Sequence, residues 1–358
     1  MKIKRQVSEI LTSAVSGERI SSEEAVVLFN EAQIYELGHA ADKLRKQRFN
    51  TNQITFIIDR NINYTNICVN QCGFCAFWRD EQNPEGYLLG EQDILKKVEE
   101  AVSEGATQIM LQGGLHPELK IDYYLKIFKK IKDKFNVVLH SLSAPEIMHL
   151  SRNSGLGLEE TILRLKLAGL DSLPGAGAEI LTDKTRKRIS GKKINTDEWF
   201  LVMETAHRFG IYSTATMMFG IGEEISERVE HMDRVRNFQD KTGNIRGFIP
   251  WTFQPGHTRI GGKEVPAEDY LKTLAISRLY LDNIPHIQGS WLTQGEEIGQ
   301  LSLFFGADDL GSIMLEENVV RATGVLRRMN TGKIVRLIKK AGFIPCQRDT
   351  EYKVVKEF

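Results

Sequence analysis

Three of the four cysteines in this chain stand close together in the sequence. Cys68, Cys72 and Cys75 have the spacing C-x3-C-x2-C in the segment CVNQCGFC, whereas Cys346 lies almost at the other end of the chain. Thiolates bind zinc and iron–sulfur clusters, and where thiols stay reduced, clustered cysteines indicate a metal or catalytic site rather than disulfides. Closed zinc sites and fully ligated clusters take four protein ligands, so this loop is one ligand short.

The missing ligand leaves three interpretations of the cysteine loop. Cys346 would complete a four-thiolate site, although it is distant in chain order and we expect it to be a small packing residue. One of His116, His140 and His257 would complete a zinc site. A four-iron cluster held by three cysteines would leave one iron open to a small molecule.

Charge and the N-terminal sequence exclude two classes of partner. Lys plus Arg and Asp plus Glu number 47 each, and a general nucleic-acid binder needs an excess of basic charge. The locally basic segment TDKTRKRISGKK (182–193) is interpreted as a solvated loop. The first residues show no signal peptide, and no apolar run approaches the roughly 20 residues that cross a bilayer. We therefore expect a cytoplasmic protein with no nucleic-acid or membrane partner.

The elements that must position the cysteines alternate between short β-type runs and amphipathic helices from residue 51 onward. Eight strands alternating with helices predict the fold class α/β, as a TIM-type (β/α)8 or near-complete barrel, with a doubly wound open sheet as the alternative. We expect a helical N-terminal extension over 1–50, a barrel over 51–310, and a C-terminal helix and tail over 311–358 that pack on the barrel. The expected strands are 54–66, 107–112, 136–142, 170–175, 212–220, 246–253, 284–291 and 301–309.

In such a barrel the cysteine loop lies where active sites are built. The loop follows the first expected strand, and the carboxyl ends of parallel barrel strands carry the catalytic residues. Gly113 and Gly114 follow the second expected strand, where glycines let a ligand approach the backbone closely, although a tight turn uses the same residues.

The segment CVNQCGFC, with an aromatic residue just before its third cysteine, resembles the signature of the radical S-adenosylmethionine (SAM) superfamily. The resemblance implies a [4Fe-4S] cluster on Cys68, Cys72 and Cys75, whose open iron binds the methionine part of SAM. One electron then splits SAM into methionine and a 5′-deoxyadenosyl radical. The resemblance also implies a low-potential electron donor, either flavodoxin or ferredoxin.

The resemblance further implies SAM contacts at the ends of the second to fourth strands. Gly113 and Gly114 match the pair that binds the amino group of SAM, and Glu179 is expected at its ribose hydroxyls or amino group. Arginine forks suit carboxylates, and Arg188 is preferred over Arg186 for the SAM carboxylate. The residues expected to bind SAM are Gly113, Gly114, Ser141, Glu179 and Arg188.

Four separate blocks narrow the resemblance to the cyclic dehypoxanthine futalosine synthases of menaquinone biosynthesis. These blocks are residues 62–80, 173–181, 248–258 and 289–320. The resemblance implies that dehypoxanthine futalosine is the small-molecule substrate. The radical would take hydrogen from C4′ of its ribose, and the carbon radical would close a ring onto the benzoate, which then loses one electron and one proton.

Polar and aromatic residues at the later strand ends suit a substrate with a sugar, a ketone and a carboxylate. The substrate-binding candidates are Gln254, Ser290, Thr293 and Gln294, with Trp251 and Trp291 either at the aromatic ring or in the core. Candidates for the final proton acceptor are Asp309, Asp308 and His257, although one of the two aspartates would equally cap a helix.

Two other functions stay open at this point. Aminofutalosine synthase, a sister radical SAM enzyme, and the synthases of the deazaflavin chromophore share the cysteine loop and the barrel. A protein that binds zinc or an iron–sulfur cluster without turning over SAM would use the same cysteines.

Overall fold

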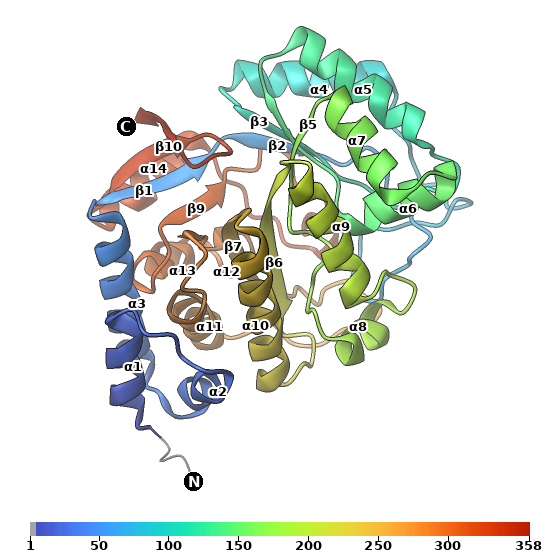
Figure 1. The fold of residues 1–358 in the computed structure, drawn as a ribbon. Coiled ribbons are helices and arrows are strands. Elements are labelled where there is room, and N and C mark those ends of the chain that lie inside the picture. Colours follow the sequence, from blue (N-terminus) through green and yellow to red (C-terminus); the bar gives the residue numbers. More distant parts are fainter. Residues whose placement is uncertain (1–4) are drawn as a thin grey trace.

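The computed structural model describes residues 5–358, in which three helices precede a barrel (Figure 1). The helices are α1 (Val7–Val15), α2 (Ser22–Glu31) and α3 (Ile34–Phe49), and they lie in the range 1–50 where the sequence predicts a helical extension. Ser21 caps α2, because its hydroxyl accepts a hydrogen bond from the Glu24 N–H while the Glu24 carboxylate accepts one from the Ser21 N–H at 2.8 Å. The extension lies against the barrel, where α3 packs on α11 (Ala267–Tyr280).

The barrel strands are parallel and alternate with helices, as the sequence predicts. Strands β2 to β8 form one sheet in chain order. The strands are β1 (Gln53–Ile57), β2 (Asp59–Ile62), β3 (Gln108–Leu111), β4 (Val138–His140), β5 (Leu170–Leu173), β6 (Tyr212–Phe219), β7 (Ile245–Thr252), β8 (His286–Ile287) and β9 (Asp309–Ser312). The accompanying helices are α4 (Glu91–Ser103), α5 (Ile121–Lys134), α6 (Ala144–Ser154), α7 (Leu158–Ala168), α8 (Asp183–Ser190), α9 (Thr196–Arg208), α10 (Ile225–Thr242), α12 (Trp291–Gln294) and α13 (Glu296–Leu301).

The ring of strands closes between its last and first members. The first expected strand is divided at Ile58 into β1 and β2. Thr55 of β1 lies opposite Asp309 of β9 in a parallel pairing, and Gln288, just after β8, forms a parallel bridge with Asp309. These pairings confirm the barrel and exclude an open doubly wound sheet.

The eighth expected strand, 301–309, is wrong. Its first residues belong to α13 and to the 3-10 helix η1 (Ser302–Phe304), and the strand that closes the barrel is β9. An apolar run such as LSLFF fits a short helix as well as a strand. Asp308 and Asp309 therefore lie at the amino end of the last strand and not at its carboxyl end.

The C-terminal segment adds two strands that the sequence does not predict. After the 3-10 turn η2 (Arg321–Thr323) and α14 (Thr331–Lys340), β10 (Ile344–Arg348) pairs in parallel with β1, and β11 (Val354–Glu357) pairs antiparallel with β10. Tyr352 lies in the turn between β10 and β11, and its ring stacks on the His286 ring with 3.8 Å between the ring centroids. A Cβ on Gly247 would lie 2.4 Å from the Tyr352 hydroxyl, so this fit requires glycine. The tail thus covers the amino end of the barrel, opposite the cysteine loop.

Two features bear on the expected organisation of the chain. Strand β9 extends across residue 310, where the sequence places the end of the barrel. Among residues 5–358, none of the helices is both long enough and apolar enough to span a membrane.

Three buried histidines make stability depend on pH. Burial lowers the pKa of His140 and His231 to about 3 and that of His207 to about 4. Below pH about 6.5 these histidines bind protons in the unfolded chain but stay neutral in the folded chain, so acid favours unfolding. Above that pH they are neutral in both states, and the folded chain keeps its full stability. Each histidine then contributes a slope of about 1.4 kcal/mol per pH unit. We expect the free energy of unfolding to fall by up to about 4 kcal/mol per unit below pH 6.5.

Urea unfolding at pH 7 and pH 5.5 measures this effect. In the wild-type chain the Leu181 N–H donates a hydrogen bond to His231 Nδ1 at 3.0 Å. His231→Asn keeps an acceptor near that N–H, and it should lower the dependence of the unfolding free energy on pH by about one third. The same unfolding free energy at both pH values in the wild-type chain would contradict the assignment.

Candidate active site

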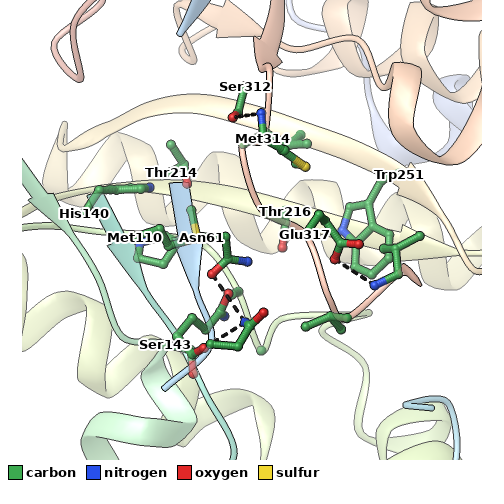
Figure 2. A pocket seen from close by; sticks show the side chains of 18 of the residues that line it. Asn61, Met110, His140, Ser143, Thr214, Thr216, Trp251, Ser312, Met314 and Glu317 are labelled. Carbon is green, nitrogen blue, oxygen red and sulfur yellow. Dashed lines mark hydrogen bonds between the residues drawn. The ribbon is translucent and has the colours of Figure 1, made fainter. Parts of the chain in front are cut away.

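A cavity of about 390 Å³ occupies the interior of the barrel. A TIM-type barrel is usually filled by side chains, so an open cavity is a ligand-binding candidate. It extends from the cysteine loop to Thr350 and Tyr352 at the amino end. Figure 2 shows the side chains that line it from opposite sides of the ring, among them Asn61, Met110, His140, Ser143, Thr214, Thr216, Trp251, Ser312, Met314 and Glu317.

The structure brings Cys68, Cys72 and Cys75 together at one end of this cavity, all as free thiols. The Cys68 N–H donates to the Arg79 carbonyl at 3.1 Å, and the Cys75 N–H donates to the Cys72 carbonyl at 3.2 Å. Burial raises the pKa of Cys72 to about 12, against the opposing effect of the Lys193 ammonium, and burial also raises the pKa of Cys75. A bound metal cation would favour ionisation of the Cys72 and Cys75 thiols.

Gly113 and Gly114 line the cavity directly behind the cysteine loop. A Cβ on Gly114 would lie 2.2 Å from the Ile67 carbonyl oxygen, and one on Gly113 would lie 2.9 Å from the Tyr64 ring. The Gly113 N–H donates to the Glu146 carboxylate at 2.9 Å and the Gly114 N–H donates to Thr65. Within residues 5–358 their own carbonyl oxygens accept no hydrogen bond, so these oxygens are available to a ligand.

Glu179 lines the cavity in an ion pair that the sequence analysis misses. The Lys193 ammonium donates to Glu179 Oε1 at 2.8 Å, and an Arg186 guanidinium nitrogen lies 3.6 Å from Oε2. Burial acts to lower the pKa of Lys193, but the Glu179 carboxylate holds it above its ordinary value. Arg186 also donates to the carbonyls of Gly177 and Ile194, and of the two cations beside Glu179 it is Lys193 that lines the cavity.

Two residues expected to bind SAM lie outside the cavity lining. Ser141 is fully buried and its hydroxyl accepts from the Leu111 N–H at 3.0 Å. Arg188 is exposed and donates to the Gly222 carbonyl at 2.9 Å. Ser143, two residues further along, does line the cavity and caps α6.

The four residues expected to bind substrate form two layers of the cavity wall that faces the cysteine loop. Ser290 and Thr293 line the cavity, with their hydroxyl oxygens 3.0 Å apart. Gln254 and Gln294 lie behind them, where Gln254 donates to the Thr293 carbonyl at 3.2 Å and Gln294 donates to the Thr252 hydroxyl at 2.9 Å.

The two tryptophans also divide between these layers. Trp251 lines the cavity (Figure 2), whereas Trp291 packs outside this wall and donates to the Ser312 carbonyl at 3.0 Å.

The three candidate proton acceptors do not line the cavity. Asp308 pairs with Arg278 and with His286 Nδ1 at 2.6 Å, and it is buried. Asp309 pairs with Arg348 at 2.6 Å beside Thr55. These positions correct the expectation that both aspartates lie at the cysteine end, because β9 begins at Asp309, at the amino end of the barrel.

His257 is exposed on a loop next to η2. Its Nδ1 lies 3.0 Å from the Ala322 carbonyl oxygen. A Cβ on the neighbouring Gly256 would lie 2.1 Å from the Thr323 carbonyl oxygen. His257 therefore helps to hold two loops together and is not part of the cavity wall.

Comparison with known proteins assigns the family. Residues 62–235 match the radical SAM superfamily and residues 242–357 match the CofH/MqnC C-terminal region. The cyclic dehypoxanthine futalosine synthase of Halalkalibacterium halodurans is 46% identical over 98% of this chain and 96% of its own length. That of Streptomyces coelicolor is 48% identical over 98% of this chain and 90% of its own length. This chain belongs to the radical SAM superfamily.

Two more comparisons concern a relative of this radical SAM enzyme that carries another name and a solved structure with the same fold. A 5-amino-6-(D-ribitylamino)uracil–L-tyrosine 4-hydroxyphenyl transferase of Methanothermobacter thermautotrophicus is 40% identical over the full length of both chains. The crystal structure of methylornithine synthase (PylB) has a TM-score of 0.75 at 18% identity, covering 94% of this chain and 97% of its own. The latter likeness shows the fold alone.

The cysteine loop fits the cluster that the radical SAM family implies. Within residues 5–358, no three His, Cys, Asp or Glu side chains converge as a single metal ion requires. In a four-iron cluster each thiolate binds a different iron, so the three thiols need only border the same space. Cys346 lies buried in β10, outside the cavity lining.

Sequence reasoning misses the polar residues that point inward from the strands of this radical SAM barrel. These are Asn61, Gln108, Ser172, Ser213, Arg246, Gln288 and Arg348. The sequence pattern that could have revealed them is a polar residue at alternate positions of an otherwise apolar strand, such as Asn61 and Asn63 in NINYTN. A filled barrel would place apolar side chains there.

Proposed function

We propose that this chain converts dehypoxanthine futalosine to cyclic dehypoxanthine futalosine in menaquinone biosynthesis. The observation that carries the proposal is the identity of 46% and 48% to two cyclic dehypoxanthine futalosine synthases over 98% of the chain. The matched length includes both the cysteine loop and the later strand ends, which line opposite walls of one cavity.

The proposed cofactors are a [4Fe-4S] cluster on Cys68, Cys72 and Cys75, and SAM. When bound, they supply a 5′-deoxyadenosyl radical that removes a hydrogen atom from C4′ of the substrate's ribose. The chain's part is to orient both ligands and to exclude water. The carbonyl oxygens of Gly113 and Gly114 suit the amino group of SAM, since an ammonium donates and these oxygens are unengaged.

Lys193 is proposed to bind the carboxylate of SAM in place of Arg188. Its ammonium lies in the cavity wall between Glu179 and the cysteine loop, over the Phe74 ring at 5.3 Å. Arg188 faces the outside of the barrel instead. Glu179, which keeps one oxygen without a hydrogen-bond partner among the described residues, would accept from the SAM ammonium or ribose hydroxyls.

Replacing Lys193 tests this assignment. We expect Lys193→Met to raise the Kd of SAM about 10- to 100-fold, because a charge-assisted hydrogen bond contributes about 1.5–3 kcal/mol. Arg188→Met is the matched control and should leave the Kd unchanged. Equilibrium dialysis of SAM against cluster-loaded protein measures both. Weakened binding in Arg188→Met with normal binding in Lys193→Met would reverse the assignment.

The substrate is proposed to lie against the wall formed by Trp251 and the Ser290–Thr293 pair. The indole ring offers a stacking surface for the benzoate, and the two hydroxyls suit the sugar. Gln254 and Gln294 would act indirectly, by holding this wall in place.

Glu317 is the proposed acceptor of the proton that the ring loses after closure. Its carboxylate lines the cavity on the same side as Trp251 (Figure 2). Burial raises its pKa above the ordinary value, which makes the carboxylate a stronger base. It accepts hydrogen bonds from the N–H groups of Val320 and Arg321, which fix its position.

A low-potential one-electron donor, flavodoxin or ferredoxin, and a cytoplasmic location complete the proposal. The family chemistry needs one electron for each activation, and free thiols facing a cavity favour a reducing compartment.

Substrate trials under anaerobic conditions test the function. Cluster-loaded protein with SAM and dithionite would receive one of three substrates: dehypoxanthine futalosine, the enolpyruvyl-benzoate of the sister synthase, or tyrosine with 5-amino-6-(D-ribitylamino)uracil. We expect only the first to be consumed, with a product two hydrogens lighter. Turnover of the second or third instead would assign a sister activity. A loaded protein that forms no 5′-deoxyadenosine with any of them would be a cluster-binding protein without this chemistry.

A further inference from the structure

The basic segment 182–193 is a helix packed on the cysteine loop, and not the solvated loop that the sequence suggests. Most of it forms α8, whose Ile189 is buried. The Gly73 N–H in the cysteine loop donates to the Ile189 carbonyl at 2.8 Å. On the other side, the Ile260 N–H donates to the Gly73 carbonyl at 3.2 Å. Gly73 is thus held between α8 and the loop 259–263, and both segments are basic.

One cation on these segments contacts the cysteine loop, and another contacts Trp78 just after it. The Lys192 ammonium donates to the Gln71 side chain at 3.1 Å. The Arg259 guanidinium carbon lies 4.1 Å from the centre of the Trp78 ring. The charge is therefore placed next to the proposed cluster ligands themselves.

The cations around the loop are exposed, and among residues 5–358 none of them forms an ion pair with a carboxylate. The one acidic residue of the segment, Asp183, is engaged elsewhere, because its carboxylate accepts from the Thr196 N–H and hydroxyl at 3.0 and 2.8 Å. We call this surface the basic face; its residues are Lys184, Lys187, Arg188, Lys192, Arg259 and Lys263.

Apolar side chains are exposed in the cysteine loop and beside Arg259. Val69 of the cysteine loop is 39% exposed and Ile260 is 37% exposed. An apolar centre with a charged border is the usual composition of a protein–protein contact. Because the whole chain has a net charge of zero, this local excess of positive charge would orient an acidic partner.

We propose that the basic face docks a small acidic one-electron carrier protein. The proposal rests on the proposed function, which needs one electron delivered to the cluster. The carrier loses one electron and the cluster gains it, with no other bond made or broken. The cysteine loop lies between the two segments of the face, so a partner bound there is close to the proposed cluster ligands. The other sides of the ligands face the barrel interior.

The test compares two double charge reversals in cluster-loaded protein. Lys184→Glu with Lys187→Glu changes the basic face. Lys96→Glu with Lys129→Glu changes two exposed lysines without ion pairs among the described residues, on α4 and α5. Figure 1 shows α4 and α5 far from α8. The measured quantity is the rate at which reduced flavodoxin bleaches the visible absorbance of the cluster, at ionic strengths of about 50 mM and about 300 mM.

We expect the basic-face variant to be reduced about tenfold more slowly at the lower ionic strength, and the difference to shrink at the higher one. The control variant should match the wild-type rate. Dithionite, a small chemical reductant, should reduce all three proteins equally, and flavodoxin should bind the basic-face variant more weakly in a titration.

Three results would overturn the proposal. Equal flavodoxin rates and affinities in all three proteins would exclude docking at this face. So would a slower reduction that dithionite reproduces, since the cluster itself would then be altered. Weaker binding of the variant to phosphatidylserine vesicles, with unchanged flavodoxin reduction, would make the face a lipid-binding surface. If dithionite-reduced wild-type protein does not cleave SAM, the proposed function fails, whatever the flavodoxin rates.

Discussion

Replacing Cys72 with serine is expected to abolish cluster loading and to lower the rate of SAM cleavage more than about 100-fold. Cys72 is the most enclosed of the three loop cysteines, at 7% exposure, and among the described residues the other cysteines that line the cavity are Cys68 and Cys75. A serine hydroxyl ionises far less readily than a thiol and is a poor ligand for iron. Iron and sulfide content, visible absorbance and 5′-deoxyadenosine formation measure the loss.

Cys346→Ser is the matched control for that experiment. Cys346 is fully buried in β10, where its neighbour across the ladder is Thr55 of β1. We expect this variant to load a full cluster and to cleave SAM at the wild-type rate, with a loss of about 1 kcal/mol in stability. Full iron content and full activity in Cys72→Ser would contradict the proposed ligand set. Loss of the cluster in Cys346→Ser would make Cys346 a fourth ligand.

Replacing Gly114 with alanine is expected to have the second-largest effect. The added Cβ would lie 2.2 Å from the Ile67 carbonyl oxygen and 3.0 Å from the Cys68 Cβ, and the nearest contacts are backbone atoms that cannot move alone. The strand end and the cysteine loop must therefore separate, breaking the 2.9 Å hydrogen bond from the Gly114 N–H to Thr65. A displacement of about 1 Å costs on the order of 100-fold in a positioned reaction.

Gly157→Ala is the control for the glycine experiment. Gly157 has φ −66°, and nothing lies within 4 Å of the position its Cβ would take, so alanine fits there. We expect normal SAM binding and turnover from Gly157→Ala. For Gly114→Ala we expect weaker SAM binding and a turnover rate about 100-fold lower, in a chain that still folds. Wild-type kinetics in Gly114→Ala would show that the cysteine loop tolerates the shift and that this contact is not required.

The sequence predicts the cysteine loop and the barrel because both are local patterns. C-x3-C-x2-C is contained in eight residues, and the alternation of strands and helices repeats along the chain. Strands β10 and β11 are not predicted, because β10 is stabilised by pairing with β1, almost 300 positions earlier.

The errors within the site follow from the same limit. Because the last barrel strand was misplaced, Asp308 and Asp309 were assigned to the cysteine end of the barrel. They lie at the amino end, where they pair with Arg278 and Arg348. Lys193 was missed because nothing in RISGKK distinguishes it from Lys192, which faces outward. The fold selects one lysine of the pair by turning it toward Glu179.

The most direct test of the proposed chemistry uses dehypoxanthine futalosine deuterated at C4′ of its ribose. Cluster-loaded protein, SAM and dithionite would be incubated anaerobically and the 5′-deoxyadenosine analysed by mass. The account predicts that deuterium appears in 5′-deoxyadenosine in step with formation of the cyclic product. Unlabelled 5′-deoxyadenosine alongside cyclic product that still carries the deuterium would contradict it.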